Sequence, residues 1–332
     1  MSAPFFSVLL PVYNARPHLG RVLRDLLAQT FRDFEIIAVD DGSTDGSAEV
    51  LGRCGDKRLR VISLPGNRGL VGALNAGLAE AQGVWIARQD ADDRCREDRL
   101  ACQRGLILRN PDTVFVYSRA RLIDGRGWWC GTMRPPLDDG GLRWDLCFRN
   151  AVPHTSAVFP AKLVRDELNG YSGDNVTADF DLWSRLLRRG KAAGDPRLLV
   201  SYRNHSGSIM GRENQSREKP SNEGLRVILV RNLVEWAGAR TEEADVIADA
   251  WLLPGDADWH RYFSIREQLA ASRPAVPASL IAEEDYTLLH RAAAVSPDCA
   301  TGMLKAMREG FARRHAWLPQ PRTLMSRITG GF

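Results

Sequence analysis

The sequence predicts an α/β fold over its first part, in which helices cover a mostly parallel sheet, and a mainly α-helical region after it. Short runs rich in apolar and β-branched residues alternate with amphipathic segments, as in a parallel sheet with its crossover helices. The 332 residues are 44% hydrophobic, enough for a full core. At roughly 150 residues per domain, this length suggests two units. We therefore expect one domain over residues 1–214 and a helical region over residues 215–332.

The first strands and the helix between them are the clearest elements. Ser7–Pro11 and Phe34–Val39 are short apolar runs typical of buried strands. Pro17 opens the segment between them, in the first helical turn where proline is tolerated. The apolar residues of this segment stand three and four positions apart, as on one face of a helix: Leu19, Val22, Leu23, Leu26 and Leu27.

The alternation continues to about residue 109. We expect three more helices, from about residue 43, over 70–80 and over 100–109, and two more strands, over 59–64 and 84–87. Each strand again comes before a helix, so the whole stretch fits a parallel sheet.

Beyond residue 110 the pattern is mixed and then helical. A strand near 113–118 leads to a hairpin that turns at Asp124-Gly125, and a helix is expected over 179–189. The stretch over 204–223 is polar and poor in apolar residues, so it is the expected linker. Amphipathic segments after it predict helices over 225–236, 241–253, 277–294 and 300–317.

Charge and cysteine content exclude some classes of protein. The formal net charge is +4, too small an excess for a nucleic acid to be the first-choice partner. The six cysteines form no C-x-x-C pair, which favours reduced thiols. The first residues lack the pattern of a secretory signal, and no apolar run reaches the roughly 18 residues that span a bilayer. We expect a cytoplasmic protein that binds no nucleic acid.

Acidic clusters follow two of the predicted strands. Asp90–Asp93 comes directly after the strand over 84–87, and Asp40–Asp45 after Phe34–Val39. Ligands of open α/β sheets collect at the carboxyl ends of strands, so both clusters indicate one site. Carboxylates this close repel one another, and Mg²⁺ or Mn²⁺, held by one or two carboxylates and by phosphate oxygens, would relieve the repulsion. Taken alone, each cluster is also typical of a turn that caps the next helix.

Three other polar residues are candidates for chemistry. Arg68 can pair with a phosphate. Asp179, at the head of the predicted helix over 179–189, suits a general base that takes a proton from an acceptor hydroxyl, or serves only the helix dipole. His205 follows Tyr202-Arg203-Asn204, and a lone histidine is more often structural than a ligand.

The order of these motifs resembles that of the family 2 glycosyltransferases, enzymes of the GT-A fold. The resemblance covers about residues 5–210. The motifs that carry it are, in chain order, Ser7–Asn14, Gln29–Phe31, Val39–Asp45, Asn67–Leu70, Asp90–Asp93, Asp98–Leu100, Gly170-Tyr171, Asp179–Trp183 and Tyr202–His205. Each motif is weak alone, but so many in one order are hard to obtain by chance.

The resemblance implies a Rossmann-like mixed sheet flanked by helices, and a role for each matching residue. Asp92 matches the acid that binds the Mg²⁺ or Mn²⁺ bridging the donor diphosphate, and His205 a position that sometimes joins this shell. Asp179 matches the base for in-line attack, which inverts the anomeric carbon. The residues implied for binding the donor nucleotide are Pro11, Tyr13, Asp40, Asp41, Arg68, Asp90 and Ala91.

Acceptor-side residues are harder to assign. His154 and Thr155 stand where acceptor contacts are common in the family, although packing explains them equally well, and Trp183 belongs to the motif of the base. The sequence also departs from the family, because Ala178 stands where a glutamate usually precedes the base. An acceptor contact of the usual kind is therefore missing.

The C-terminal tail is basic. From Ala300 onward there is one acidic residue, Glu309, and apolar residues separate the basic ones. The six basic residues are Lys305, Arg308, Arg313, Arg314, Arg322 and Arg327. A basic amphipathic helix can lie on an anionic membrane, here the inner face of the cytoplasmic membrane, or can pack with its cationic face in solvent. Both interpretations stay open.

These observations combine into one hypothesis. It is a metal-dependent, inverting transfer of a sugar from a nucleotide sugar, with UDP-sugars favoured, to a hydroxyl of a glycan or lipid-linked acceptor. Synthesis of bacterial surface polysaccharide or glycolipid would use such a reaction. A nucleotidyltransferase or a dinucleotide-dependent oxidoreductase on a similar sheet is an alternative. The missing G-x-G-x-x-G after the first strand argues against the oxidoreductase. A degenerate transferase that binds a glycan or a protein is the other alternative, and Asp92 and Asp179 argue against it.

Overall fold

The computed structural model describes residues 3–204, 222–254 and 257–272, and beyond them residues 288, 292, 299, 301–303, 305 and 306. These residues divide into two compact units. The first contains the chain up to Asp139 and from Ala151 to residue 204, and the second contains Gly140–Asn150 and the described residues from 222 onward. Residues 140–150 therefore do not belong to the domain that the sequence predicts over 1–214. The predicted end of that domain, at residue 214, lies outside the described residues.

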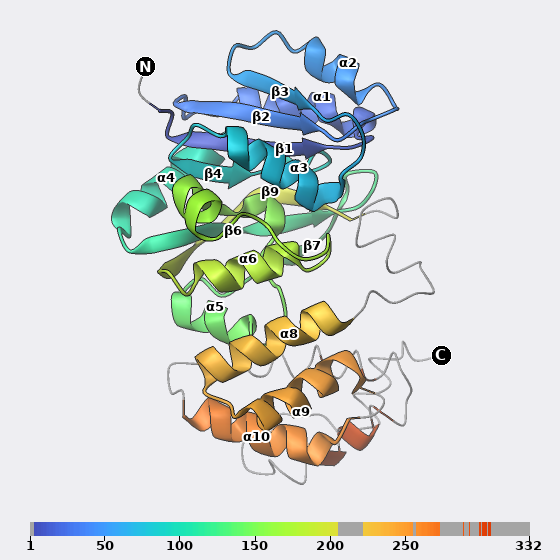
Figure 1. Cartoon of the computed structure of the whole chain (residues 1–332), viewed down its shortest axis with the longest axis vertical. Helices are drawn as coiled ribbons and strands as arrows, with labels where there is room; N and C mark the ends of the chain where they lie inside the picture. The colour runs from blue at the N-terminus through green and yellow to red at the C-terminus, as the bar shows by residue number, and fades with distance from the viewer. Residues whose placement is uncertain are drawn as a thin grey trace. The chain divides into compact units, whose positions relative to one another are not determined.

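The first unit is built on one mixed sheet. Its strands are β1 (Phe6–Val12), β2 (Phe34–Asp40), β3 (Leu59–Ser63), β4 (Trp85–Arg88), β5 (Arg94–Cys95), β6 (Thr113–Ile123), β7 (Trp129–Met133), β8 (Val158–Pro160) and β9 (Lys191–Arg203). They lie in the order β3-β2-β1-β4-β8-β6-β9-β5, and β7 pairs with β6 (Figure 1). Strands β3, β2, β1 and β4 are parallel, β8 runs antiparallel to both its neighbours, and β9 runs parallel to β6. The chain changes direction across the sheet between β1 and β4, where α/β sheets bind ligands.

Helices cover both faces of the parallel strands. The helices of this unit are α1 (Arg16–Leu27), α2 (Ser47–Gly52), α3 (Gly69–Glu80), α4 (Arg99–Arg109) and α6 (Ala178–Leu186), with a 3-10 turn, η1 (His154–Ser156), and a π-helical turn, η2 (Leu163–Glu167). Helix α2 begins at Ser47, later than the predicted start near residue 43. The reason is the left-handed backbone of Gly42 and Gly46, with φ of 75° and 90°, which a right-handed helix cannot contain.

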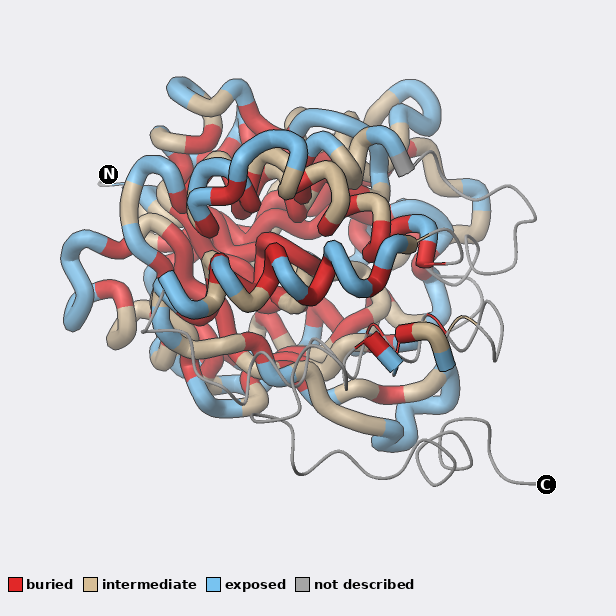
Figure 2. The backbone as a smooth tube through the Cα atoms, turned by 90° about the horizontal axis from the view of Figure 1, so that it is seen from below, coloured by how far each residue is buried: buried red, intermediate tan, exposed pale blue. Residues whose placement is uncertain are grey.

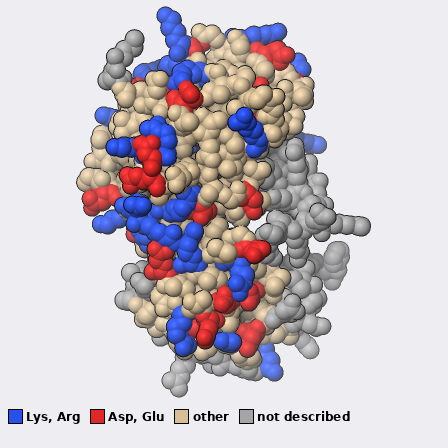
Figure 3. Space-filling view, in the orientation of Figure 1, with Lys and Arg blue, Asp and Glu red and all other residues tan. Residues whose placement is uncertain are grey.

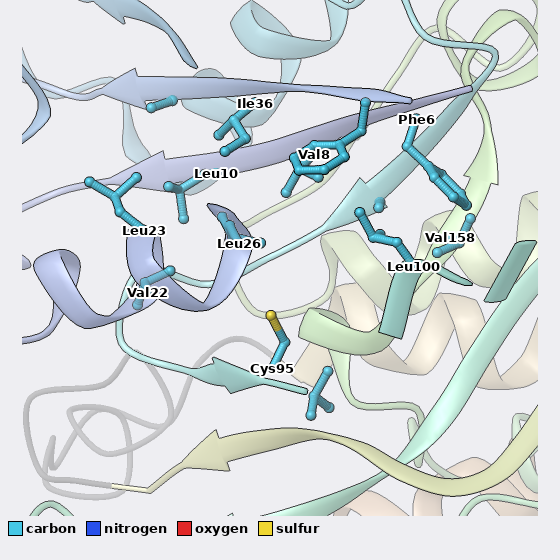
Figure 4. Close-up of a cluster of buried hydrophobic side chains, with 14 of the residues drawn as sticks. Phe6, Val8, Leu10, Val22, Leu23, Leu26, Ile36, Cys95, Leu100 and Val158 are labelled. Carbon is cyan, nitrogen blue, oxygen red and sulfur yellow. The ribbon is translucent and has the colours of Figure 1, made fainter. Parts of the chain in front are cut away.

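The core of the first unit lies on the two faces of β1 and β2. Every residue of these strands is buried, as expected for parallel strands covered on both sides. On one face, Val22, Leu23 and Leu26 of α1 point toward the strand residues Leu10 and Ile36 (Figure 4). In Figure 2 the strands form the buried layer, while the helices alternate between buried and exposed positions.

Helix α3 covers the other face and comes very close to it. A Cβ atom on Gly77 would lie 2.3 Å from Cδ1 of Leu9 and 2.8 Å from Cγ2 of Val39. Only glycine permits this approach. The approach fixes α3, whose first turn borders the crevice between β1 and β4.

The second unit is helical in the part that the structure describes. It contains most of α5 (Asp139–Asp145), α8 (Asn222–Asn232), the π-helical turn η3 (Leu233–Ala237), α9 (Thr241–Leu252) and α10 (Trp259–Ala271). Buried aromatic rings form part of its core, and the Phe148 and Trp251 centroids are 5.7 Å apart. The predicted linker and most of the predicted helices over 277–294 and 300–317 lie outside the described residues.

Many charged side chains lie on the surface. On the face that Figure 3 shows, Lys and Arg are interspersed with Asp and Glu. No helix among the described residues is long and apolar enough to cross a membrane.

Candidate active site

A cavity of about 430 Å³ lies at the carboxyl ends of β1 and β4. Its walls come from several parts of the first unit: Pro11–Ala15 at the end of β1, His18 of α1, Asp41 after β2, Asn67 and the first turns of α3, Asp90–Asp92 after β4, His154, Asn175 and Val176 with the start of α6, and Tyr202-Arg203 at the end of β9. The crevice beside β1 is therefore where the two strand-end acidic clusters and the head of α6 meet.

A buried arginine lies beneath the acidic turn. Arg88, the last residue of β4, is 0% exposed. Its Nη2 donates to Oδ1 of Asp90 at 2.6 Å, and its Nε donates to Nε2 of His154 at 3.2 Å. Burial raises the pKa of Asp90, Arg88 opposes this shift, and the neighbouring Asp92 adds to it. Arg88 is thus the counter-charge that lets carboxylates accumulate at this strand end.

Asp93 is the most buried member of the cluster. Its Oδ1 accepts the backbone N–H of Arg203 at 2.6 Å, while its Oδ2 is buried without a hydrogen-bond partner among the described residues. Burial raises the pKa of Asp93 well above its usual value, and repulsion from Asp92 and Asp90 adds to the rise. Three mutually repelling carboxylates, of which Asp93 has a buried oxygen without a hydrogen-bond partner among the described residues, have the donor chemistry of a site for a hard divalent cation.

The described residues alone do not complete a metal shell here. Within the described residues, no three His, Cys, Asp or Glu side chains converge on one point as metal ligands. His205, the second ligand that the sequence predicts, lies outside the described residues. Asp92 does line the cavity. One carboxylate facing a cavity suits a cation that takes its remaining ligands from substrate phosphate oxygens and water.

The predicted base lies in the same cavity. Asp179 stands in the first turn of α6, where the helix dipole favours its ionised form, and its Oδ1 accepts the backbone N–H of Phe180 at 2.7 Å. The pKa of the Tyr202 hydroxyl indicates which carboxylates act on it. Burial raises the pKa of its hydroxyl, and so do, in decreasing order, Asp90, Asp93, Asp92 and Asp179. Acids from β4 and α6 thus act on one hydroxyl at the end of β9.

His154 forms part of the wall as a neutral ring. Burial and the charge of Arg88 hold the pKa of His154 well below its ordinary value of 6.5. Because Arg88 can only donate, Nε2 of His154 is an acceptor, and it also lies 3.1 Å from the hydroxyl of Tyr171. An imidazole with a lowered pKa and an engaged lone pair is a weak base. Asp179 is the better candidate for proton abstraction.

The residues expected to bind the nucleotide separate into two groups. Five of them line the cavity: Pro11, Tyr13, Asp41, Asp90 and Ala91. Asp40 and Arg68 are not among its lining residues. Asp40 is 5% exposed and accepts the backbone N–H of Ser43 at 3.1 Å, while the backbone N–H of Arg68 donates to Oδ1 of Asp41 at 2.7 Å. Asp40 therefore shapes the loop, and the Arg68 backbone holds Asp41 in place.

The expected acceptor-side residues are also separated. His154 lines the cavity, but Thr155 and Trp183 are each 0% exposed. The Oγ1 of Thr155 accepts the backbone N–H of Asp90 at 3.2 Å, so it supports the acidic turn. Trp183 stacks on Phe115 with ring centroids 4.4 Å apart. Thr155 and Trp183 are both enclosed by protein, so the expectation that they contact an acceptor stays a prediction.

Sequence reasoning missed several contributors to the cavity. Tyr202 lies in a motif that the resemblance includes, yet its place beside the carboxylates depends on β9 running parallel to β6. Asn175 had no signal. It lines the cavity and its Oδ1 accepts the backbone N–H of Val71 at 3.2 Å, which joins the start of α3 to the loop before α6.

The mixed α/β sheet with a carboxylate-lined crevice at the ends of β1 and β4 agrees with the GT-A fold. The model of the Glycosyl transferase family 2 matches residues 7–159. The putative teichuronic acid biosynthesis glycosyltransferase TuaG of Bacillus subtilis is 30% identical over 216 residues, which are 62% of this chain and 81% of TuaG. The chain belongs to the family 2 glycosyltransferases. It covers 75% of one related glycosyltransferase of Haemophilus influenzae, but 45% of another.

Solved structures share the fold. S. aureus TarS 1-349, crystallised with UDP-GlcNAc, has a TM-score of 0.60 and 18% identity, covering 100% of this chain and 89% of TarS 1-349. The mannosyltransferase PcManGT of Pyrobaculum calidifontis, in complex with GDP-Man and Mn²⁺, has a TM-score of 0.50 and 19% identity, covering 94% of this chain and 88% of PcManGT. At these identities the likeness extends to the fold alone.

Proposed function

We propose that this glycosyltransferase moves a sugar from a nucleoside diphosphate sugar to an acceptor hydroxyl with inversion at the anomeric carbon. The observation that carries the proposal is the shared cavity of Asp92 and Asp179. In-line displacement needs an activated nucleophile on one face of the sugar and a stabilised leaving group on the other. Acids from two separate elements facing one cavity meet that need.

Asp179 takes the proton of the acceptor hydroxyl in this proposal. Its competitor in the wall is His154, whose lowered pKa and engaged Nε2 make it a weak base. His154 instead keeps Arg88 directed toward Asp90. The family resemblance assigns the same role to the position of Asp179.

Asp92 holds Mg²⁺ or Mn²⁺ in this proposal, with the substrate diphosphate. The bound metal supplies neutralisation of the charge that develops on the departing nucleoside diphosphate. Asp90 and Asp93 keep Asp92 in a negative surrounding that favours a cation. The complex of PcManGT with Mn²⁺ supports a divalent ion for this fold. His205 as a further ligand remains a proposal on the resemblance alone.

The donor is a nucleotide sugar, and we favour a UDP-sugar. Tyr13 is 44% exposed at the cavity, which leaves its ring accessible to a base, and Asp41 can accept a base N–H. The UDP-GlcNAc complex of TarS supports uracil, whereas the GDP-Man complex of PcManGT makes guanine the alternative.

The biological setting is proposed from the relatives. TuaG is described as acting in teichuronic acid synthesis, and the putative glycosyltransferase EpsE of Bacillus subtilis is 28% identical over 195 residues. We propose a cytoplasmic role in bacterial surface polysaccharide synthesis, on a glycan or lipid-linked acceptor. The catalytic domain is residues 1–214 without 140–150. Contact of the basic tail with an anionic membrane stays a hypothesis, because most of that tail lies outside the described residues.

The test is nucleoside diphosphate release from UDP- and GDP-sugars in the presence of Mn²⁺ and an acceptor extract. Asp179→Asn should lower sugar transfer at least about a thousandfold while binding of UDP with Mn²⁺ is unchanged. Asp181→Asn is the matched control, because Asp181 is on the same helix but binds Arg185 at 2.7 Å and does not line the cavity. Transfer by Asp179→Asn at the parental rate would show that the base is another group.

A further inference from the structure

A second cavity, of about 450 Å³, adjoins the first and is lined by arginines. The two cavities share His18, Asp92 and Arg203. Asp92 is the one carboxylate among the described residues that line the second cavity. The arginines, which together define what we call the arginine cavity, are Arg16, Arg21, Arg24, Arg94, Arg126 and Arg203.

Two of these arginines are held in place by the protein. Arg94 donates through its Nη2 to Oδ1 of Asp25 at 2.9 Å, so its charge is partly neutralised. Arg203 is 4% exposed, and its guanidinium donates to the backbone carbonyls of Asp92 at 2.9 Å and Asp124 at 3.1 Å. Backbone carbonyls carry no formal charge. Arg203 is therefore a fixed, uncompensated cation at the border between the two cavities.

Three others are exposed and have no acidic partner among the residues that the structure describes. Arg21, Arg24 and Arg126 form no ion pair with any residue in the described part of the chain. Surface arginines usually lie near carboxylates, and a group of unpaired arginines around one cavity repels itself. An anionic ligand would remove that repulsion, and guanidinium groups bind phosphate oxygens with two parallel hydrogen bonds.

Helix α1 leaves room for such a ligand. Its apolar face is in the core, and Arg16, Gly20 and Arg24 follow one another at four-residue spacing on the opposite face. A Cβ atom on Gly20 would meet nothing within 4 Å. The missing side chain opens the space between the arginines.

The hairpin between β6 and β7 borders the same cavity and carries exposed aromatic rings. Gly125 and Arg126 line the arginine cavity, and Trp128 and Trp129, directly after them, are 72% and 67% exposed. Exposed tryptophans bind sugar rings and lipid interfaces through their faces. An anion site with adjacent aromatic rings fits a phosphate-bearing substrate that continues into a sugar or a lipid.

We propose that the arginine cavity binds a phosphate group of the acceptor, so that the acceptor is a phosphate-bearing molecule. This inference rests on the proposed function. The residues that line only the first cavity include Tyr13 and Asp41 on the nucleotide side and the base Asp179. None of these lines the arginine cavity. Asp92 lines both cavities, so the acceptor phosphate lies beside the donor diphosphate and apart from the nucleotide base, while the acceptor hydroxyl enters the first cavity.

Gly20→Glu tests the assignment because it adds a carboxylate where the structure has space. The probes are inorganic pyrophosphate in EDTA, for the arginine cavity, and UDP with Mn²⁺, for the donor site, both measured by calorimetry. Gly20→Glu should weaken pyrophosphate binding about tenfold, as expected when one negative charge is placed a few ångströms from the anion and repels it. Gly20→Gln, the neutral control of the same size, should weaken it less than about threefold. UDP binding should be unchanged in both variants.

The outcomes separate this inference from the proposed function. Equal pyrophosphate affinity in Gly20→Glu and the parent overturns the arginine cavity as an anion site. A parallel loss of UDP affinity overturns the acceptor assignment, because the cavity then serves the donor. A parent protein that binds pyrophosphate but neither UDP nor GDP overturns the proposed function instead.

A third probe distinguishes the two sources of acceptor phosphate. Decyl diphosphate, below its micelle concentration, should bind more tightly than pyrophosphate if the acceptor is lipid-linked, and replacing Trp128 with alanine should remove the gain. Equal affinity of the two probes assigns the phosphate to a soluble glycan chain. Either interpretation requires that Gly20→Glu weakens the binding of both pyrophosphate and decyl diphosphate.

Discussion

Two glycines on the helices that cover β1 and β2 should respond in opposite directions to the same substitution. In Gly77→Ala the new Cβ atom would lie 2.3 Å from Leu9 and 2.8 Å from Val39, far inside van der Waals contact, so α3 has to move away from the sheet. Gly20→Ala on α1 meets nothing within 4 Å. The two variants therefore separate packing from helix propensity.

The magnitudes follow from these contacts. Alanine in place of a helical glycine stabilises by about 0.5–1 kcal/mol, and Gly20→Ala should gain this amount. Overpacking a close-packed core costs about 1–3 kcal/mol. Gly77→Ala should therefore lose about 1–2 kcal/mol net. Because α3 also borders the cavity, the same variant should weaken UDP binding, whereas Gly20→Ala should leave it unchanged.

The assay is urea unfolding followed by circular dichroism, with the parent and both variants measured under one condition. The midpoint should fall for Gly77→Ala and rise for Gly20→Ala, with similar m-values. If Gly77→Ala is as stable as the parent or more stable, the close approach of α3 to the sheet is not a feature of the folded protein.

Three further predictions concern the site. His154 has a lowered pKa in the folded protein, so the unfolded chain takes up the proton first as the pH is lowered. The free energy of unfolding should therefore be at its full value above the ordinary pKa of 6.5. Below that pH it should fall by up to about 1.4 kcal/mol per pH unit. His154→Gln should flatten this part of the profile, and an unchanged slope would contradict the lowered pKa. Arg88→Met should lower the free energy of unfolding by about 3–5 kcal/mol, because it leaves the Asp90 carboxylate without its ion-pair partner. The same substitution should cost much less in an Asp90→Asn protein, and equal costs in the parent and in Asp90→Asn would rule out an interaction between Arg88 and Asp90. Asp92→Asn should lower the Mn²⁺-dependent thermal stabilisation by UDP, corresponding to at least tenfold weaker binding, and no change would assign the metal elsewhere.

The sequence predicted the parallel half of the sheet well because its signals are local. The apolar runs of β1 and β2 and the stripe of α1 are visible within a dozen residues, and both acidic clusters do follow strands. The outer half depends on pairing between distant segments. Strand β9 pairs with β6 across about 80 residues of chain, and nothing in either segment specifies that partner.

The sequence did not indicate how deeply individual side chains of the site lie in the protein. Asp179 and Trp183 belong to one motif of the family resemblance, and the motif does not indicate how deeply each side chain lies. The cavity ends at the first turn of α6, however, and the next turn enters the core, where Trp183 meets Phe115. Arg88, directly before the acidic turn, is fully buried, and its residue type does not indicate that depth.

The position of Arg88 also explains how the fold tolerates its own active site. Asp90 and Asp93 both have raised pKa values, so ionised carboxylates at this strand end oppose folding as the pH rises. Arg88 lies under the turn and the Arg203 backbone lies over it, and each holds one member of the cluster. These two contacts leave Asp92 at the cavity in a field that is still negative. A cation bound there with a diphosphate would remove the remaining repulsion, and binding of the donor should therefore stabilise the first unit more at a pH above the raised pKa values of Asp90 and Asp93 than at a pH below them.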